Sequence, residues 1–236
     1  TRMSGRRVSC DIMFLTAVGM KSLMYLISVD EHSGFVIIIK IEDRSGNTLK
    51  AALKKLCDLY LIHGHEIKCF RLDSEKCFIA CKEPLLELRI ECEMATAGRH
   101  VRKAERVIID LKGGTRATVF GHTVAIPQFY YDTIVEFVPG SLNYTFTAEN
   151  EYVTSHEIFT GKQVSMEDHL SIRWGDLVVT YDPEDNKKSM AVRGNVGMII
   201  GRSQDSKGSA VVLDLRTKRR VTRHKFERIK WNKLSV

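Results

Sequence analysis

An aspartate in the middle of an apolar run near the start of the chain constrains the fold most. The residue is Asp11, and the run covers residues 8–15. A second apolar run, residues 67–72, is followed directly by Asp73, and Glu105 stands among basic residues at the start of a helical pattern. A carboxylate is costly to bury unless it is paired or binds a metal. Two strand acids and a helix acid that converge could therefore supply the metal ligands of a two-metal nuclease or transferase site.

The first strands read as an antiparallel meander. Residues 8–15, 22–29 and 34–41 are apolar or β-branched, and short connections rich in Gly, Ser, Asp and His separate them. Ser45 is a good N-cap for a helix that runs to about Ile62, and Gly64 ends it. A helical crossover before the next strand makes the two strands that it joins parallel, so we expect residues 66–72 to lie parallel to the first strand.

Further helices alternate with one short strand. Ser74 is expected to cap a helix that is interrupted or restarted at Pro84, and a strand follows near residues 91–95. The Glu105 helix should place this acid on one face with Val101, Ile108 and Ile109. The last helical pattern covers about residues 123–138, with an expected inner face of Ile126, Phe129, Tyr130, Ile134 and Phe137.

Two adjacent glycines interrupt the Glu105 helix pattern. Gly113 and Gly114 each cost a helix about 1 kcal/mol relative to alanine. We expect the helix to fray or bend near residues 111–115, and we expect replacement of both glycines by alanine to stabilise a helical backbone there. Residues 101–111 still offer three turns to hold Glu105 against the sheet.

This element order predicts an α/β fold: a ribonuclease-H-like, mixed five-stranded sheet with flanking helices. From about residue 170 the sequence pattern becomes typical of short strands, which we expect at residues 177–180, 196–201, 210–215 and 220–223. Several short strands at close spacing predict a small all-β, SH3-like barrel. We therefore expect a core domain over residues 1–165 and a barrel over residues 170–236.

The charge is unevenly distributed between these two parts. Residues 170–236 hold 15 Lys and Arg against 7 Asp and Glu, whereas the whole chain holds 36 against 29. A neutral first part with a basic final part suggests a polyanion, most often nucleic acid, as the partner; a basic surface that only confers solubility is the alternative.

The sequence shows no apolar run of the roughly 20 residues that a membrane span needs. The six cysteines form no CxxC pair, which favours thiols in a reducing compartment.

Five motifs together resemble the integrase of Copia-type (Pseudoviridae) retrotransposons. They are D-I-M-F at residues 11–14, R-x-D-x-E at 71–75, H-V-x-x-x-E-R at 100–106, S-H-E-I-F-T-G at 155–161 and I-R-W-G-D-L-V at 172–178. Residues 208–223 are similar to the family's C-terminal barrel. The sequence lacks the family's upstream His/Cys zinc module, and Ser74 stands where the family usually has glycine.

The resemblance implies that Asp11, Asp73 and Glu105 hold two Mg²⁺ or Mn²⁺ ions. It also implies 3′-end processing and strand transfer of element DNA into duplex target DNA by a homo-oligomer, with no membrane and no small-molecule cofactor. The implied location is the nucleus and the cytoplasm, in a virus-like particle or preintegration complex. A decayed or domesticated DNA-binding scaffold with the same fold is the first alternative, and a ribonuclease H that cleaves RNA–DNA hybrids is the second.

Basic residues near Glu105 and in the barrel are the expected contacts to nucleic acid. A solvated helix start and a solvated barrel edge are the alternatives at the two places. With Trp231 nearby, the barrel residues also suggest base stacking. The candidates are Arg99, His100, Arg102, Lys103, Arg106, Arg219, Arg220, Arg223, Lys225 and Lys230.

Overall fold

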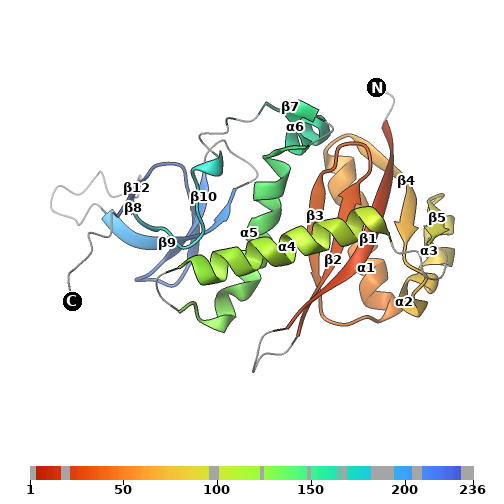
Figure 1. Cartoon of the computed structure of the whole chain (residues 1–236), viewed down its shortest axis with the longest axis horizontal. Helices are drawn as coiled ribbons and strands as arrows, with labels where there is room; N and C mark the ends of the chain where they lie inside the picture. Colours follow the sequence, from red (N-terminus) through yellow and green to blue (C-terminus); the bar gives the residue numbers. More distant parts are fainter. Residues whose placement is uncertain are drawn as a thin grey trace.

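Two five-stranded sheets, connected by long helices, make up the computed structural model (Figure 1). It describes residues 4–16, 22–95, 101–122, 125–147, 150–163, 165, 169–181, 194–203 and 209–229. The first sheet contains β1 (Ser4–Leu15), β2 (Leu23–Asp30), β3 (Val36–Ile41), β4 (His65–Leu72) and β5 (Glu91–Met94). Its order is β3-β2-β1-β4-β5, in which β4 and β5 run parallel to β1 and the other pairs are antiparallel. This mixed sheet confirms the expected ribonuclease-H-like architecture.

The crossover helix is α1 (Gly46–Ile62), with the ends that the sequence predicts. The Ser45 hydroxyl accepts a hydrogen bond from the Thr48 N–H at 3.3 Å, which satisfies one free amide of the first turn. After the helix, Gly64 takes a left-handed φ of 76°, a conformation that favours glycine.

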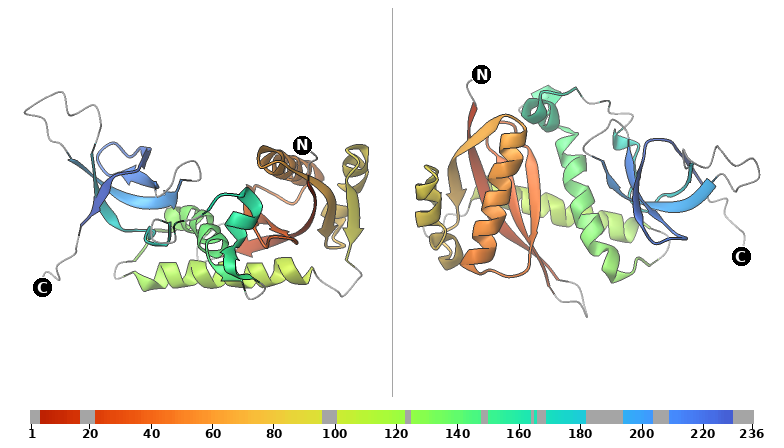
Figure 2. Two further views of the ribbon diagram at one scale, coloured as in Figure 1. Left: turned by 90° about the horizontal axis from the view of Figure 1, so that it is seen from above. Right: turned by 180° about the vertical axis from the view of Figure 1, so that it is seen from behind.

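Helices cover both faces of the first sheet, as Figure 2 shows, with α1 on one face and α4 (Arg102–Gly121) on the other. Side chains of a strand alternate between faces, so Val8, Cys10 and Ile12 pack in the core under α1. Met13 lies instead in the core that α4 and α5 (Tyr131–Asn143) complete. The acid that follows Cys10 therefore points to the face of α4.

The segment after β4 is helical and interrupted close to Pro84, as predicted, but its cap differs from the prediction. Two short helices, α2 (Lys76–Ile79) and α3 (Lys82–Glu87), occupy it, and Pro84 lies in the first turn of α3, where its missing N–H costs no helical bond. The prediction that Ser74 caps a helix was wrong. Glu75 is the N-cap of α2, and the Ser74 hydroxyl donates to the Ala95 carbonyl beyond β5.

The predicted break at the glycine pair was also wrong, because α4 runs without interruption from Arg102 to Gly121. A Cβ on Gly114 would stand only 2.7 Å from Cγ1 of Val138 in α5, so this glycine allows the two helices to approach closely. A Cβ on Gly113 would meet nothing within 4 Å. Tertiary packing of α4 on α5 outweighs the weak helix propensity of the pair.

Helix α5 begins later and ends later than predicted. Pro127 has an extended ψ of 138°, the short 3₁₀ turn η1 (Gln128–Tyr130) follows it, and the α-helix starts at Tyr131. The residue before a proline avoids the helical region, which accounts for the late start. The prediction for Phe129 was wrong, since its side chain is 73% exposed. The helix continues through Pro139 to Asn143, where the side chain of Asn143 bonds to the backbone of Val36.

The second sheet is antiparallel and all-β, as expected. It contains β8 (Leu177–Tyr181), β9 (Gly194–Arg202), β10 (Ala210–Asp214), β11 (Arg220–Arg223) and β12 (Phe226–Arg228). Its order is β11-β10-β9-β8-β12, so the last strand returns beside the first. The sequence did not predict β12. Between the two sheets lie the hairpin β6 (Phe146–Thr147) and β7 (Asn150–Thr154) and the helix α6 (Ser155–Thr160).

A common hydrophobic core joins the second sheet to the helices of the first. It contains Met13 and Ile27 from the first sheet, Leu111 from α4, Ile134 from α5, and Trp174, Val178, Ile199 and Val212 from the second part. Arg202 of β9 strengthens this junction: its guanidinium lies 3.7 Å from the centre of the Phe137 ring and donates to the carbonyls of Phe137, His169 and Ile172. The two sheets therefore share one packed interior.

Two further expectations concern the whole chain. All six cysteines are free thiols, as the spacing predicts. Among the residues described, the helices are too short or too polar to cross a membrane.

Candidate active site

Parallel pairing of β1 and β4 brings the two strand acids to the same end of the sheet. Ser9 is the register partner of Arg71. Continuing this register by two residues along both strands sets Asp11 beside Asp73, which directly follows the last residue of β4. Because strand side chains alternate with a period of two, these acids share the face of Ser9 and Arg71. Asp11 is half-buried, and its Oδ1 accepts a hydrogen bond from the Ile12 N–H at 2.7 Å.

The third acid reaches this face from the first turn of α4. Val101 and Ala104 are buried and anchor the start of the helix against the sheet, and the Glu105 N–H donates to the Val101 carbonyl at 3.1 Å. Glu105 is partly buried. The expectation that Ile109 shares the inner face was wrong: its side chain is 63% exposed, so Val101 and Ile108 bear the packing.

Neighbouring acids affect the pKa of Asp11. Its pKa is raised to about 6, first because the carboxyl is desolvated by burial, and then because Asp73, Glu75 and Glu105 repel its charge, against a lowering by the Ile12 N–H. A like charge nearby disfavours ionisation. The structure thus brings Asp11 within electrostatic reach of three further carboxylates from three separate elements.

Glu75 is the fourth acid at the site, and a cation already holds it. Arg44, just before α1, forms an ion pair with Glu75, and the Cys77 thiol donates to the same carboxylate at 3.4 Å. The guanidinium of Arg44 also lies over the Phe14 ring at 5.5 Å from its centre. Sequence analysis did not find Arg44, because nothing in its neighbourhood marks it except the adjacent N-cap Ser45.

A network of charged side chains supports the same face, and sequence analysis missed it as well. Arg71 donates to Glu31 and to Glu93, both at 3.2 Å, and Ser9 donates to Glu31. Lys103 of α4 donates to the Glu31 carbonyl at 3.1 Å, which ties the start of α4 to the end of β2. These partners are 22 to 72 residues apart in sequence, and no local pattern predicts such contacts.

The donor types fit a hard divalent cation, because Mg²⁺ and Mn²⁺ prefer carboxylate oxygens and the mutual repulsion around Asp11 favours a positive charge. Within the described ranges, however, no group of three or more His, Cys, Asp or Glu side chains is arranged to hold a metal ion. The assignment of Asp11, Asp73 and Glu105 as metal ligands therefore stays a prediction.

The expected nucleic-acid contacts near Glu105 divide into two sets. Arg102, Lys103 and Arg106 are exposed on the first turns of α4, and Arg106 forms an ion pair with Asp110 one turn later at 3.7 Å. Arg99 and His100 lie outside the described residues. The three described cations surround the start of the helix that carries Glu105.

In the second sheet the basic residues gather on and around the edge strand β11. Arg219, Arg220 and Lys225 are exposed, and Arg223 is half-buried and donates to the Thr222 carbonyl at 3.3 Å. Lys230 and Trp231 lie outside the described residues. Exposed cations on and beside an edge strand suit the phosphate backbone of a nucleic acid.

The two downstream motifs have structural explanations. Thr154 and Glu157 form a capping box that starts α6, Phe159 is buried, and Gly161 ends the helix with a left-handed φ of 69°. In the second motif, the Trp174 indole donates to the Thr133 hydroxyl at 3.1 Å, which fixes the junction to α5. Both motifs position elements of the fold.

Comparisons with known proteins show the fold. No family model matches the sequence, and no curated protein matches it. Solved structures do match, among them the HTLV-2 integrase catalytic core domain in complex with magnesium, in a dimeric and in a trimeric form. The dimeric form has a TM-score of 0.52 and 13% identity, and the match covers 68% of this chain and 98% of that one. The trimeric form gives a TM-score of 0.51, 14% identity, and 66% and 97% coverage. The chain therefore has the ribonuclease-H-like fold of an integrase catalytic core, with an additional antiparallel sheet.

Proposed function

We propose that this chain is a DNA strand transferase of the integrase type, in which Asp11, Asp73 and Glu105 hold two divalent cations, Mg²⁺ or Mn²⁺. The observation that carries the proposal is the parallel register of β1 and β4, which sets Asp11 beside Asp73 on the sheet face covered by α4, the helix that carries Glu105 in its first turn. The pKa of Asp11, raised by burial and by Asp73, Glu75 and Glu105, agrees with this convergence. The shared fold with an integrase core described in complex with magnesium supports it.

The chemistry assigns a part to each group. Two divalent ions held by Asp11, Asp73 and Glu105 would activate the attacking hydroxyl and stabilise the leaving oxygen of a phosphodiester. Burial and the neighbouring acids raise the pKa of Asp11 to about 6, so its carboxyl must release a proton before it can coordinate a metal ion. Metal binding should therefore strengthen as the pH rises through that value. The attacking group is water in 3′-end processing and a DNA 3′-hydroxyl in strand transfer.

Basic residues would hold the DNA on either side of the acids. Arg102, Lys103 and Arg106 are exposed beside Glu105 and can contact phosphates close to the reacting bond. Arg219 and Arg220 on the second sheet, with Arg223 and Lys225, would bind the duplex backbone further away. Arg99, His100 and Lys230 complete the proposed set.

The finer assignment rests on the sequence motifs. We assign the chain to a Copia-type retrotransposon integrase, with a catalytic core over residues 1–165 and an SH3-like barrel over residues 170–236. Duplex element ends and target DNA are its partners, and it works as a homo-oligomer in the nucleus and cytoplasm. The dimeric and trimeric forms of the integrase neighbours support self-association.

A non-catalytic DNA-binding scaffold is the second candidate. It is favoured by the lack of a ready-made metal-binding group within the described residues and by the ion pair that already occupies Glu75. A scaffold keeps the fold and the basic second sheet but has no need for the acids.

A joining assay separates these functions. The chain is incubated with a fluorescent DNA end, a supercoiled plasmid and Mn²⁺. The integrase proposal predicts joined product that Asp73→Asn abolishes and that Asp110→Asn, an exposed acid on the same helix as Glu105, leaves unchanged. A scaffold binds both DNAs and joins neither. Cleavage of an RNA–DNA hybrid in place of joining would indicate a ribonuclease H.

A further inference from the structure

The outer strand β3 has a partly occupied edge. It is the last strand of the first sheet on its side, so within the described part of the chain its outer backbone groups have no strand partner. Asn143, at the end of α5, takes the place of one residue of such a partner. Its side-chain oxygen accepts from the Val36 N–H at 2.7 Å, and its nitrogen donates to the Val36 carbonyl at 2.8 Å. The carboxamide thus makes the two bonds that one residue of an antiparallel strand makes.

The register shows which further groups point outward. The Asp30 N–H donates to the Phe35 carbonyl, so that pair faces inward across the ladder. Inward and outward pairs alternate along an antiparallel pair. Val36, Ile38 and Lys40 therefore turn their N–H and C=O groups away from β2. Asn143 uses those of Val36, and a strand placed alongside would find Ile38 and Lys40 next in line.

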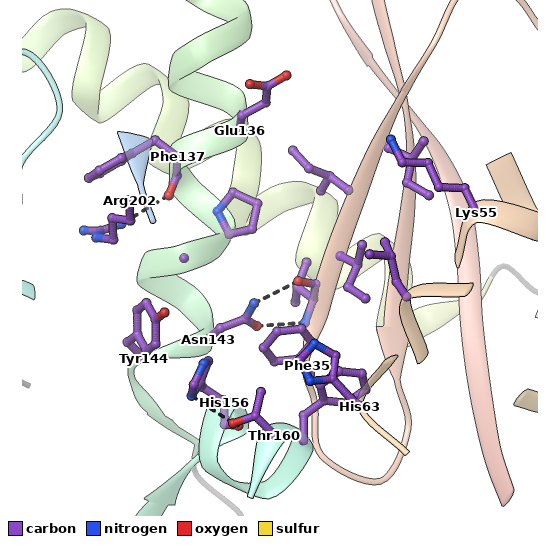
Figure 3. Close-up of a pocket in the computed structure, with 18 of the residues that line it drawn as sticks. Phe35, Lys55, His63, Glu136, Phe137, Asn143, Tyr144, His156, Thr160 and Arg202 are labelled. Carbon is purple, nitrogen blue, oxygen red and sulfur yellow. Dashed lines mark hydrogen bonds between the residues drawn. The ribbon is translucent and has the colours of Figure 1, made fainter. Parts of the chain in front are cut away.

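A groove runs along this edge. It is a pocket of about 400 Å³ lined by residues 35–40, with α1 on one side, α5 on the other and α6 at one end (Figure 3). The α1 wall presents Lys55, Leu59 and His63, which are spaced by one helical turn each. The α5 wall presents Phe137 and Pro139 next to Asn143. A floor of strand edge between two helical walls suits one extended chain.

The charge of the groove is mainly positive. Lys40, Lys55, Lys162 and Arg202 line it, while Glu136 is the acid among the lining residues. His63 and His156 also line it, but burial lowers the pKa of both, to about 4 for His156, so neither adds positive charge at pH 7. Lys40 is paired with Asp132 and Arg202 with backbone carbonyls. Lys55 and Lys162 are exposed and make no ion pair with any described residue. The α1 side therefore offers unsatisfied positive charge, and the α5 side offers apolar surface.

We propose that the β3 groove binds an extended acidic peptide segment of a partner protein, which adds to the first sheet as a sixth strand. Its backbone pairs with the outward groups of Ile38 and Lys40. Because side chains of a strand alternate, acidic residues face Lys55 and Lys162 while apolar residues in between face Phe137 and Pro139. Backbone bonds give affinity, and the alternation of acidic and apolar side chains gives specificity.

A second copy of this chain fits the groove poorly. A two-fold contact brings the same surface of both copies together. Lys55 and Lys162 of each copy would then face those of the other, and like charges across an interface repel. An acidic strand has the complementary charge.

The test uses a fluorescein-labelled seven-residue peptide that alternates glutamate with valine, and fluorescence anisotropy with the whole chain at low salt. A peptide with lysine for glutamate tests the charge. A third peptide, N-methylated at alternate residues, cannot pair its backbone with a strand edge. We expect both changes to weaken binding about tenfold or more, since each removes more than 1.4 kcal/mol of interaction.

Two variants on α1 form a matched pair. Lys55→Glu reverses a charge that lines the groove, and Lys54→Glu reverses the exposed neighbour that does not line it. The first should weaken the acidic peptide about tenfold, and the second by less than about twofold. Sedimentation of the unlabelled chain reports self-association under the same conditions.

Four results would overturn the proposal. The first is equal binding of the acidic, basic and N-methylated peptides, and the second is equal effects of the two variants. The third is a dimer that Lys55→Glu dissociates and that the acidic peptide does not displace, because a second copy would then occupy the groove. Absence of binding by the acidic peptide at millimolar concentration also contradicts it.

Discussion

At the scale of one residue, the ionised carboxylate of Asp11 destabilises the folded chain. Burial and three neighbouring acids raise its pKa to about 6 from an ordinary value of 3.8. Between these values the folded chain holds a proton that the unfolded chain has released. The stabilising contribution is therefore complete below pH 3.8 and is lost as the pH rises through about 6.

Asp11→Asn should consequently raise the melting temperature at pH 7.5 in the absence of metal, because it removes a desolvated charge. The gain should disappear near pH 4, where the native carboxyl is already protonated. Thermal unfolding at the two pH values measures it, with the exposed Asp110→Asn as the control. A variant that is less stable than the native chain at pH 7.5 would contradict the environment described for Asp11.

The sequence was informative about Asp11 and Asp73 for a physical reason. Each acid interrupts or ends an apolar strand, and the helical crossover fixed the strands as parallel neighbours, so their proximity followed from topology. Arg44 and Arg71 could not be predicted in the same way. They contact Glu75 and Glu31 across 31 and 40 residues, and an isolated arginine carries no mark of its partner.

At the scale of elements, the two glycines of α4 have different roles. Gly114 faces Val138 of α5, where a Cβ would stand 2.7 Å from a methyl carbon, and Gly113 faces open space. Helix propensity was visible in the sequence, whereas the approach of α5 was not. The late start of α5 and the exposed Phe129 have a related cause. The spacing of apolar residues indicates a helix face, but it does not show that the helix begins only after Pro127.

Gly113→Ala should stabilise the chain by about 1 kcal/mol, because the backbone is helical and the methyl group has room. Gly114→Ala should destabilise it by about 1 kcal/mol, since overpacking costs about 1–3 kcal/mol and helix propensity returns only part of that. Urea unfolding of both variants gives the two free energies. Equal stabilisation by both substitutions would show that α4 and α5 pack less closely than described.

At the scale of the whole molecule, Arg202 connects the two sheets. Its guanidinium bonds to three carbonyls and to the Ser141 hydroxyl, and burial lowers its pKa to about 10, so it stays charged at neutral pH. Arg202→Ala leaves these acceptors without a partner and should cost at least about 3 kcal/mol. The exposed Arg220→Ala should change stability by less than about 0.5 kcal/mol.

Urea unfolding measures this difference. One cooperative transition is expected for the native chain, because the second sheet shares its core with α4 and α5. A loss below about 1 kcal/mol for Arg202→Ala would show that the junction depends on the apolar contacts alone.

DNA binding should depend on salt through the second sheet. Each phosphate contact contributes about 0.9 to the slope of log affinity against log salt concentration. Replacing Arg219 and Arg220 together by alanine should flatten the slope by about two units if both contact phosphates. Lys50→Ala with Lys54→Ala on α1 is the control of equal charge. An unaltered slope would mean that β11 faces away from DNA.

The central claim is that Asp11, Asp73 and Glu105 bind divalent metal together, and a Mn²⁺ titration followed by thermal unfolding tests it most directly. Binding to the native state raises the melting temperature. The account predicts a rise for the native chain and for Asp110→Asn, and little or no rise for Asp11→Asn, Asp73→Asn and Glu105→Gln. The same rise in all five proteins would contradict the metal site.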